Sequence, residues 1–216
     1  HDIPHSVFHI DKGFFYTLFA LFARPGGMIK DFLEGKRVKY FRPFAYVILM
    51  STISTLLTKW ILSGMESVYR KHYPDAVIPH HESFFSHYFS LFIFLMIPVV
   101  SLVTYLFFKK NRYNFWEHCL VNTFLAAQLN IMQVLIYLVS FIFLLTAHKI
   151  INTDFFIPVF MSVFLYLYGS VFGFLMNKEY KTGRLILKLT LMNTLLFFVY
   201  TTGFQLAGIM KPWITQ

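Results

Sequence analysis

Five long apolar stretches, free of acidic and basic side chains in their centres, constrain this chain more than any other feature. They run over Pro43–Leu62, Tyr88–Phe108, His118–Ala147, Phe155–Met176 and Leu185–Ile209. Each is near or above the ~20 residues that an α-helix needs to cross ~30 Å of hydrocarbon. Hydrophobic residues make up 57% of the chain and charged residues 13%, whereas roughly a quarter of a soluble domain is charged. The sequence therefore predicts an all-α polytopic membrane helix bundle with five transmembrane helices.

The segment before the first apolar stretch is of a different kind. Asp11–Ala23 is apolar but too short to span a bilayer, and a turn-forming Arg-Pro-Gly-Gly sequence ends it. Met28–Glu34 follows as a second short helix of mixed character. Both suit amphipathic helices that lie along the membrane surface. We therefore expect residues 1–42 to form cytoplasmic interfacial helices with a basic segment, and residues 43–216 to form the transmembrane domain.

The basic residues predict the orientation of the bundle, because cytoplasmic loops of membrane proteins carry an excess of Lys and Arg. Of the 19 basic residues, all but five fall on the side of the amino terminus. The five on the other side are Lys59, Arg70, Lys71, Lys149 and Lys211. We expect a bacterial inner-membrane protein with a cytoplasmic amino terminus and an external carboxyl terminus. The charges flank apolar runs, which argues against a nucleic-acid partner despite the net charge of +9.

A basic block lies directly before the first span. It comprises Gly35, Lys36, Arg37, Lys39, Tyr40 and Arg42. Such a block could bind anionic lipid headgroups, with about 1 kcal/mol from each nearby charge, or it could bind partner proteins. The alternative is ordinary positive-inside topology with aromatic anchoring. Gly35 favours binding, because a glycine lets the backbone turn tightly or approach a ligand.

A polar seam follows the third span at steps of three or four residues, which places its members on one helix face. The seam consists of His118, Asn122, Ala126, Asn130, Gln133, Tyr137 and Ser140. Polar groups in hydrocarbon need partners, so this face must meet other helices or water. It could line the path of a small transporter or channel, or it could fix the bundle by hydrogen bonds between helices. The fifth span offers five partners for the second case: Thr190, Asn193, Thr194, Tyr200 and Thr201.

Glu117 and His118 open the third span where the seam reaches the cytoplasmic surface, and with the basic block they are candidates for binding lipid or a partner protein. A neighbouring carboxylate and imidazole could perform acid–base chemistry in a lipid-modifying enzyme. They could equally be interfacial residues that cap the helix, since a carboxylate at a helix start is favoured. No obvious nucleophile accompanies them, so the enzyme hypothesis ranks last.

Two further patterns are weaker. The loop between the first two spans is rich in histidine, namely His72, His80, His81 and His87, with Glu82. The zinc-protease spacing fails because Phe85 stands where a second histidine is required, so we predict no metal and no cofactor. Gly169 and Gly173 form a small-residue stripe on the fourth span that permits close packing, within the bundle or between protomers.

Two segments resemble a bacterial membrane-protein family of unknown function. The first holds Arg24-Pro25-Gly26, then Gly35-Lys36-Arg37, and ends with the proline that opens the first span; the second is Asn111–Leu125. Members often begin with a small zinc ribbon, which this chain lacks, so we expect upstream residues before His1. The resemblance implies no activity. The five-span topology is also similar to that of Yip1-type membrane proteins.

These features favour a non-enzymatic membrane component that binds anionic lipid or partner proteins through its basic cytoplasmic face. A small transporter or channel built on the seam is the first alternative. The scarcity of charges inside the spans counts against ion-coupled transport, since such residues usually mark ion pathways. A lipid-modifying enzyme around Glu117 and His118 is the second alternative.

Overall fold

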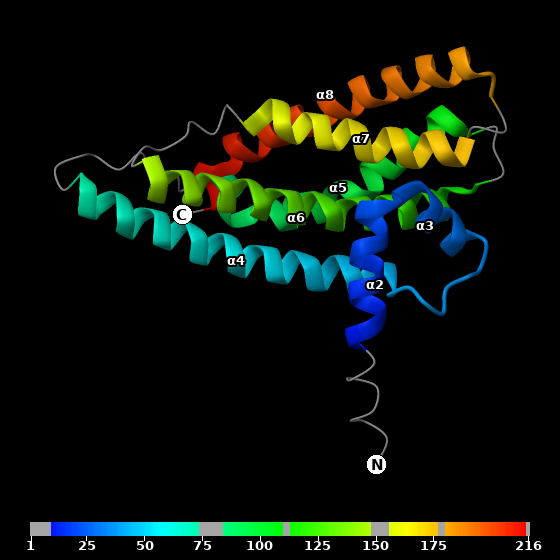
Figure 1. The fold of residues 1–216 in the computed structure, drawn as a ribbon. Coiled ribbons are helices and arrows are strands. Elements are labelled where there is room, and N and C mark those ends of the chain that lie inside the picture. The colour runs from blue at the N-terminus through cyan, green and yellow to red at the C-terminus, as the bar shows by residue number, and fades with distance from the viewer. Residues whose placement is uncertain (1–9, 74–83, 110–112, 148–155, 177–179, 215–216) are drawn as a thin grey trace.

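The computed structural model describes residues 10–73, 84–109, 113–147, 156–176 and 180–214. These residues form seven α-helices and no strand, which confirms the all-α prediction (Figure 1). The helices are α2 (Ile10–Ala23), α3 (Pro25–Leu33), α4 (Pro43–His72), α5 (Phe84–Phe108), α6 (Phe115–Ala147), α7 (Phe156–Met176) and α8 (Thr182–Ile214). Each predicted helix is present, but several extend beyond the predicted ranges. Helix α4 continues well beyond Leu62, α5 begins at Phe84 and α8 continues to Ile214. Helix α3 begins at Pro25, so the Pro-Gly-Gly segment predicted as a turn is helical, because a proline is tolerated in the first turn of a helix.

Among the described residues, four stretches are long and apolar enough to cross a membrane. They are Pro43–His72, Ser90–Phe108, Phe115–Ala147 and Thr182–Val199. Gly13–Ala23 and Ser162–Met176 are shorter apolar helical stretches. The structure therefore describes a helical, membrane-embedded protein, and the fifth predicted span, on α7, stays a prediction.

The five long helices lie side by side, and α6 is the central one. It packs most extensively against α4, then against α5, and more lightly against α7. Helix α8 closes the bundle against α5 and α7. Every residue from Val121 to Asn130 on α6 is buried, and small side chains such as Ala126 and Ala127 let the neighbouring helices approach this segment.

The two short helices cross one end of the bundle instead of extending it (Figure 1). Helix α3 packs against α7, and α2 packs against α3. Phe14 and Leu21 on α2, with Met28 and Phe32 on α3, belong to the same buried core as the long helices. The short helices are therefore an integral part of the fold, and their placement along the membrane surface stays a prediction.

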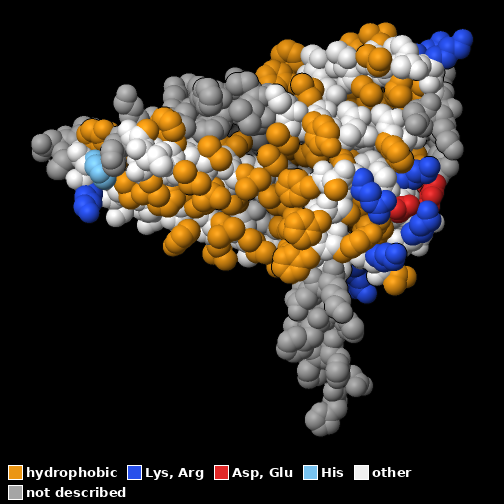
Figure 2. Space-filling model, in the orientation of Figure 1, with side chains coloured by type: hydrophobic (Ala, Val, Ile, Leu, Met, Phe, Trp, Pro, Cys, Tyr) orange, Lys and Arg blue, Asp and Glu red, His pale blue; other side chains and the backbone are white. Residues whose placement is uncertain are grey.

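Helix α2 is apolar on its outer side as well. Phe15, Phe19 and Phe22 are exposed at a spacing of four and three residues, which puts them on one face. A helix that is apolar all round suits surroundings that are themselves apolar. Figure 2 shows hydrophobic side chains beside a group of basic and acidic ones at the end of the molecule where α2 and α3 lie.

Candidate functional site

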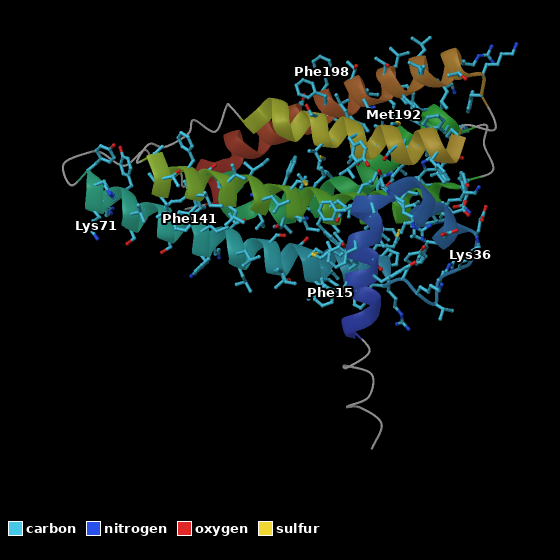
Figure 3. The ribbon with its side chains drawn as sticks, viewed as in Figure 1. Phe15, Lys36, Lys71, Phe141, Met192 and Phe198 are labelled. Carbon is cyan, nitrogen blue, oxygen red and sulfur yellow. The ribbon has the colours of Figure 1, made fainter. Side chains whose placement is uncertain are left out.

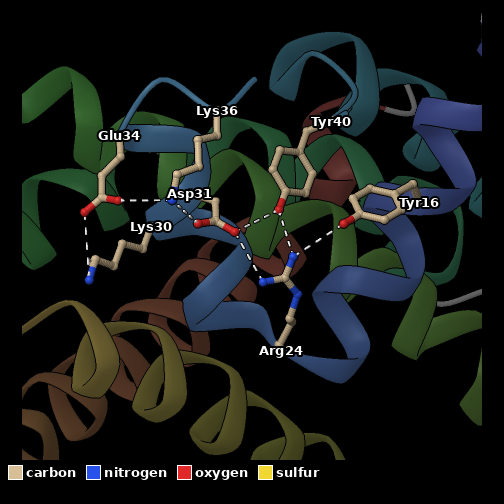
Figure 4. Close-up of polar contacts among 7 residues, drawn as sticks. All are labelled: Tyr16, Arg24, Lys30, Asp31, Glu34, Lys36 and Tyr40. Carbon is tan, nitrogen blue, oxygen red and sulfur yellow. Dashed lines mark hydrogen bonds and ion pairs between the residues drawn. The ribbon is translucent and has the colours of Figure 1, made fainter. Parts of the chain in front are cut away.

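Arg24 organises the end of the bundle that carries α2 and α3. Its guanidinium donates hydrogen bonds to the Tyr16 and Tyr40 hydroxyls, at 3.4 and 3.1 Å, and forms an ion pair of 3.2 Å with Asp31. Tyr40 in turn donates to the Asp31 carboxylate at 3.2 Å. Lys36 binds the other carboxylate oxygen at 3.0 Å (Figure 4). Asp31 thus joins α2, α3 and the loop that leads to α4.

These contacts shift the pKa values of their members. The Lys36 ammonium, which hydrogen-bonds the Asp31 carboxylate, lowers the pKa of Asp31 below its ordinary value. The same hydrogen bond raises the pKa of Lys36, and burial raises the pKa of Tyr40. Because Arg24 and Lys36 are largely exposed, solvent screens the ion pairs, and their main effect is orientation.

Two glycines shape this region. Gly35 has a φ of 92° and follows the last residues of α3 in a Schellman motif. In that motif the Lys36 amide donates to the Asp31 carbonyl at 2.9 Å, and the Gly35 amide donates to the Phe32 carbonyl at 3.2 Å. The geometry at the end of α3 therefore accounts for the glycine at position 35. A ligand is not needed to explain it.

Gly26 is the point where α3 meets α7. A Cβ atom added there would lie 2.6 Å from the Phe174 Cβ and 2.8 Å from the Ser170 carbonyl oxygen. By contrast, nothing lies within 4 Å of such an atom at Gly169, and at Gly173 the nearest is a Leu189 methyl at 3.7 Å. The close helix contact within the chain therefore uses Gly26, and association of protomers through the α7 glycines stays a prediction.

The basic block separates into two kinds of residue. Lys36 and Tyr40 belong to the Asp31 network, and Lys36 also lies 3.7 Å from Glu34. Arg37 donates to the Phe32 carbonyl at 3.2 Å, and its guanidinium lies 5.3 Å from the centre of the Phe32 ring. These three side chains are positioned by α3.

The other two cations face outward. Lys39 and Arg42 are exposed, and neither side chain takes part in an ion pair or hydrogen bond with any residue that the structure describes. Val38 between Arg37 and Lys39 is fully exposed. An exposed apolar side chain among cations matches the chemistry of a lipid interface, in which anionic headgroups lie beside hydrocarbon.

Glu117 and His118 are not brought together. Glu117 accepts a hydrogen bond from the Asn114 amide at 2.7 Å, while its own amide donates to the Asn114 side chain at 2.9 Å. This reciprocal pair is a capping box at the start of α6. His118 points into the core, 3.1 Å from the Thr104 hydroxyl and stacked on Phe172 at 5.7 Å. The geometry supports the capping interpretation of Glu117 over an acid–base pair.

The polar seam on α6 is buried between helices. Asn122 donates to the Ser101 and Thr104 hydroxyls of α5 at 3.3 and 3.0 Å, and to the His118 carbonyl at 2.8 Å. Asn130 donates to the Ser51 hydroxyl of α4 at 3.2 Å. Gln133 is buried and Tyr137 half-buried. The hydrogen bonds of the seam therefore hold α4, α5 and α6 together.

The predicted partners on the fifth span whose side chains the structure describes do not hydrogen-bond to the seam. Thr190 and Thr194 donate to carbonyls of their own helix, at Ile186 and Thr190. Tyr200 and Thr201 have side chains outside the described residues. The seam turns away from α8 because α4 and α5 are the main neighbours of α6, and helix spacing alone does not reveal which neighbour a face meets.

Several residues of these networks were missed from the sequence. Asp31 and Arg24 had no assigned role, and the partners Ser101 and Thr104 were not noticed, although their spacing of three residues puts them on one face of α5. Tyr46 on α4 was also missed; its hydroxyl donates to buried Gln128 at 3.4 Å. His80, His81 and Glu82 lie outside the described residues, as does the side chain of His87.

The comparisons with known proteins give one match. No curated protein and no solved structure matches the chain. The zinc ribbon and the likeness to Yip1-type proteins therefore stay predictions. Residues 11–55, which include α2, α3 and the beginning of α4, match a family described as "Protein of unknown function (DUF3667)".

Proposed function

We propose that this chain is a five-span inner-membrane protein with its amino terminus in the cytoplasm. Helix α7 has 21 residues, which at 1.5 Å per residue is about the ~30 Å thickness of the hydrocarbon core. Lys188, the one cation inside the last predicted span, donates to the Phe107 carbonyl at 2.8 Å. Its charge thereby stabilises the C-terminal end of α5, where cations are favoured.

The proposed function is the binding of anionic lipid headgroups by the basic loop, which we define as residues 35–42. The observation that carries it is the exposure of Lys39 and Arg42 beside fully exposed Val38. The exposed face of α2 with Phe15, Phe19 and Phe22 lies at the same end of the molecule (Figures 2 and 3). Cations next to an aromatic surface combine the two attractions that hold a segment at a lipid interface.

The Asp31 network sets the geometry of this loop. Arg24, Lys36 and Tyr40 already form hydrogen bonds or ion pairs in this network, so they have fewer free donors for a lipid headgroup. Arg37 donates to the Phe32 carbonyl and is therefore intermediate between the residues of the Asp31 network and the unpaired side chains of Lys39 and Arg42. We therefore assign headgroup binding to Lys39 and Arg42, with Lys36, Arg37 and Tyr40 as positioning residues.

The transporter and channel alternative is less well supported by the geometry. Asn122 and Asn130 donate to α5 and α4, so the amides bridge helices, as expected of polar residues that stabilise a membrane bundle. The competing proposal is that the same basic loop binds a partner protein.

The test measures lipid affinity after selective loss of charge. Protein in nanodiscs or mild detergent is titrated with phosphatidylglycerol, and bound lipid is counted by native mass spectrometry. Replacing Lys39 and Arg42 by Gln removes two nearby charges of about 1 kcal/mol each, which predicts an affinity about thirty-fold lower at low salt.

The matched control replaces Lys71 and Lys181 by Gln, which changes the net charge equally. Lys71 lies at the opposite end of the bundle from Lys36 (Figure 3), and both control side chains are exposed. Equal loss of lipid in the two double variants would contradict the proposal. If the variant at Lys39 and Arg42 bound lipid normally but lost a co-purifying protein, the basic loop would instead be a binding site for that protein.

A further inference from the structure

A groove opens on the flank of the bundle between α4 and α5. Its volume is about 390 Å³, and its lining is half hydroxylated and half apolar. The hydroxyl side chains are Ser51, Thr52, Thr55 and Ser90, and the apolar ones are Ile48, Leu56, Leu91 and Phe94. Hydroxyl groups gathered beside exposed apolar ones are unusual on a surface that faces hydrocarbon, because such a surface is normally apolar.

The floor of the groove connects to the polar seam. Asn130 is fully buried and donates to the Ser51 hydroxyl at 3.2 Å. The other amide atom, Asn130 Oδ1, has no hydrogen-bond partner among the described residues. Since Ser51 accepts from Asn130, the proton of Ser51 is free for an acceptor outside the described protein. Thr55 donates to the Ser90 hydroxyl across the groove at 3.1 Å and to the Ser51 carbonyl of its own helix at 2.8 Å.

Two of the lining hydroxyl groups already donate within α4. Thr52 donates to the Ile48 carbonyl at 2.9 Å, and Thr55 donates to the Ser51 carbonyl at 2.8 Å. Ser51 and Ser90 accept from Asn130 and Thr55, and neither donates its proton to a described residue. The groove thus offers two hydroxyl protons to a ligand, those of Ser51 and Ser90.

Lys59 stands one turn beyond the groove. It follows Thr52, Thr55 and Leu56, three lining residues, by seven, four and three positions, which places it on the same face of α4. Side chains on a helix lean toward its amino terminus, so we expect the side chain of Lys59, which is exposed, to extend toward Thr55 and Leu56. Among the described residues it has no ion-pair or hydrogen-bond partner. A lysine in this position supplies positive charge at the mouth of a groove with apolar walls.

We propose that this groove and Lys59 form a second lipid site, for one anionic glycerophospholipid. Lys59 binds the phosphate, and the hydroxyl groups of Ser51 and Ser90 donate to the glycerol and ester region, with Thr55 holding Ser90 in place. Leu56, Leu91 and Phe94 contact the acyl chains. The site goes beyond the proposed function, because Lys59 lies ~24 Å along α4 from Pro43 and hence far from the basic loop.

The test uses phosphatidylglycerol and phosphatidylcholine as probes, because the two share a glycerol and ester region and differ in net charge. Native mass spectrometry measures the affinity of each lipid for the full chain in mild detergent. Lys59→Gln should lower phosphatidylglycerol affinity about five-fold and leave phosphatidylcholine unchanged. Thr55→Val with Ser90→Ala should weaken both lipids alike, since the hydroxyl groups contact what the lipids share.

The location is tested with a phosphatidylglycerol whose acyl chain carries a photoactivatable group. Cross-links should map to residues 48–56 and 91–94, and they should persist when Lys39 and Arg42 are replaced by Gln. The variant with Lys39 and Arg42 replaced by Gln separates this site from the basic loop. Each of the two proposals can therefore be contradicted independently of the other. Lys71→Gln and Thr146→Val serve as controls for a lost charge and a lost hydroxyl on exposed positions elsewhere.

Three results would overturn the inference. In the first, Lys59→Gln binds phosphatidylglycerol with the same affinity as Lys71→Gln. In the second, the variant with Thr55→Val and Ser90→Ala binds both lipids with the same affinity as Thr146→Val. In the third, the cross-links map outside residues 48–56 and 91–94. Circular dichroism melting of each variant shows whether it is folded. If the hydroxyl variant fails to fold, the Lys59 affinities and the cross-link positions still decide the outcome.

Discussion

The region around α2 and α3 and the polar seam of α6 hold helices together by opposite chemistry. The first uses charges: Arg24 and Lys36 both pair with Asp31. The second uses neutral groups: Asn122 and Asn130 donate to hydroxyl groups on α5 and α4. Ionised groups are costly inside hydrocarbon, whereas amides and hydroxyls can satisfy one another there. The chemistry of each contact therefore follows the surroundings in which it has to form.

The largest effect is expected where the α2–α3 region meets the bundle by shape alone. Gly26→Leu places a side chain where Phe174 and Ser170 already are. Overpacking of this kind costs about 1–3 kcal/mol and occasionally more, so we expect α3 to separate from α7 and the melting temperature in detergent to fall. Gly27→Leu is the control, because an added Cβ there first meets the flexible Arg24 side chain at 3.7 Å. Equal melting temperatures of the two variants would contradict the assigned contact.

An intermediate effect is expected in the seam. Asn122→Leu removes the donor shared by Ser101 and Thr104, and we expect a loss of roughly 1–2 kcal/mol in unfolding free energy. Denaturation in mixed micelles measures it. Thr146→Val, at an exposed hydroxyl that donates to a carbonyl of its own helix, should change little. A variant with normal stability but abolished solute flux would instead favour the transporter alternative.

The smallest effect is expected in the ion-pair network and depends on pH. The pKa of Asp31 is lower in the folded protein than its ordinary value of 3.8. Its contribution to stability is therefore present above that ordinary value and is lost as the pH falls through the lower, folded-state pKa. Asp31→Asn should reduce this acid dependence and lower the melting temperature slightly at neutral pH. A variant as sensitive to acid as the parent protein would show that Asp31 does not carry this dependence.

Much of the candidate site was visible in the sequence because it is local. The apolar stretches predicted the long helices, and the seam positions are buried or half-buried as their spacing indicated. The turn at Gly35 was anticipated, and the end of α3 accounts for it; a ligand at Gly35 stays a prediction. The capping of α6 by Glu117 was one of two alternatives, and the contacts of Asn114 favour it.

The sequence by itself determined which segments are helical and which helix faces carry polar groups, because both follow from periodicity along a short length of chain. Only the tertiary structure decided which faces meet. It brought Asn122 to Thr104 rather than to α8, Gly26 to Phe174, and Asp31 both to Arg24 before α3 and to the basic loop after it. The physical reason is that partner choice depends on how each helix is rotated and shifted against its neighbours, and that arrangement is set by the packing of the whole bundle.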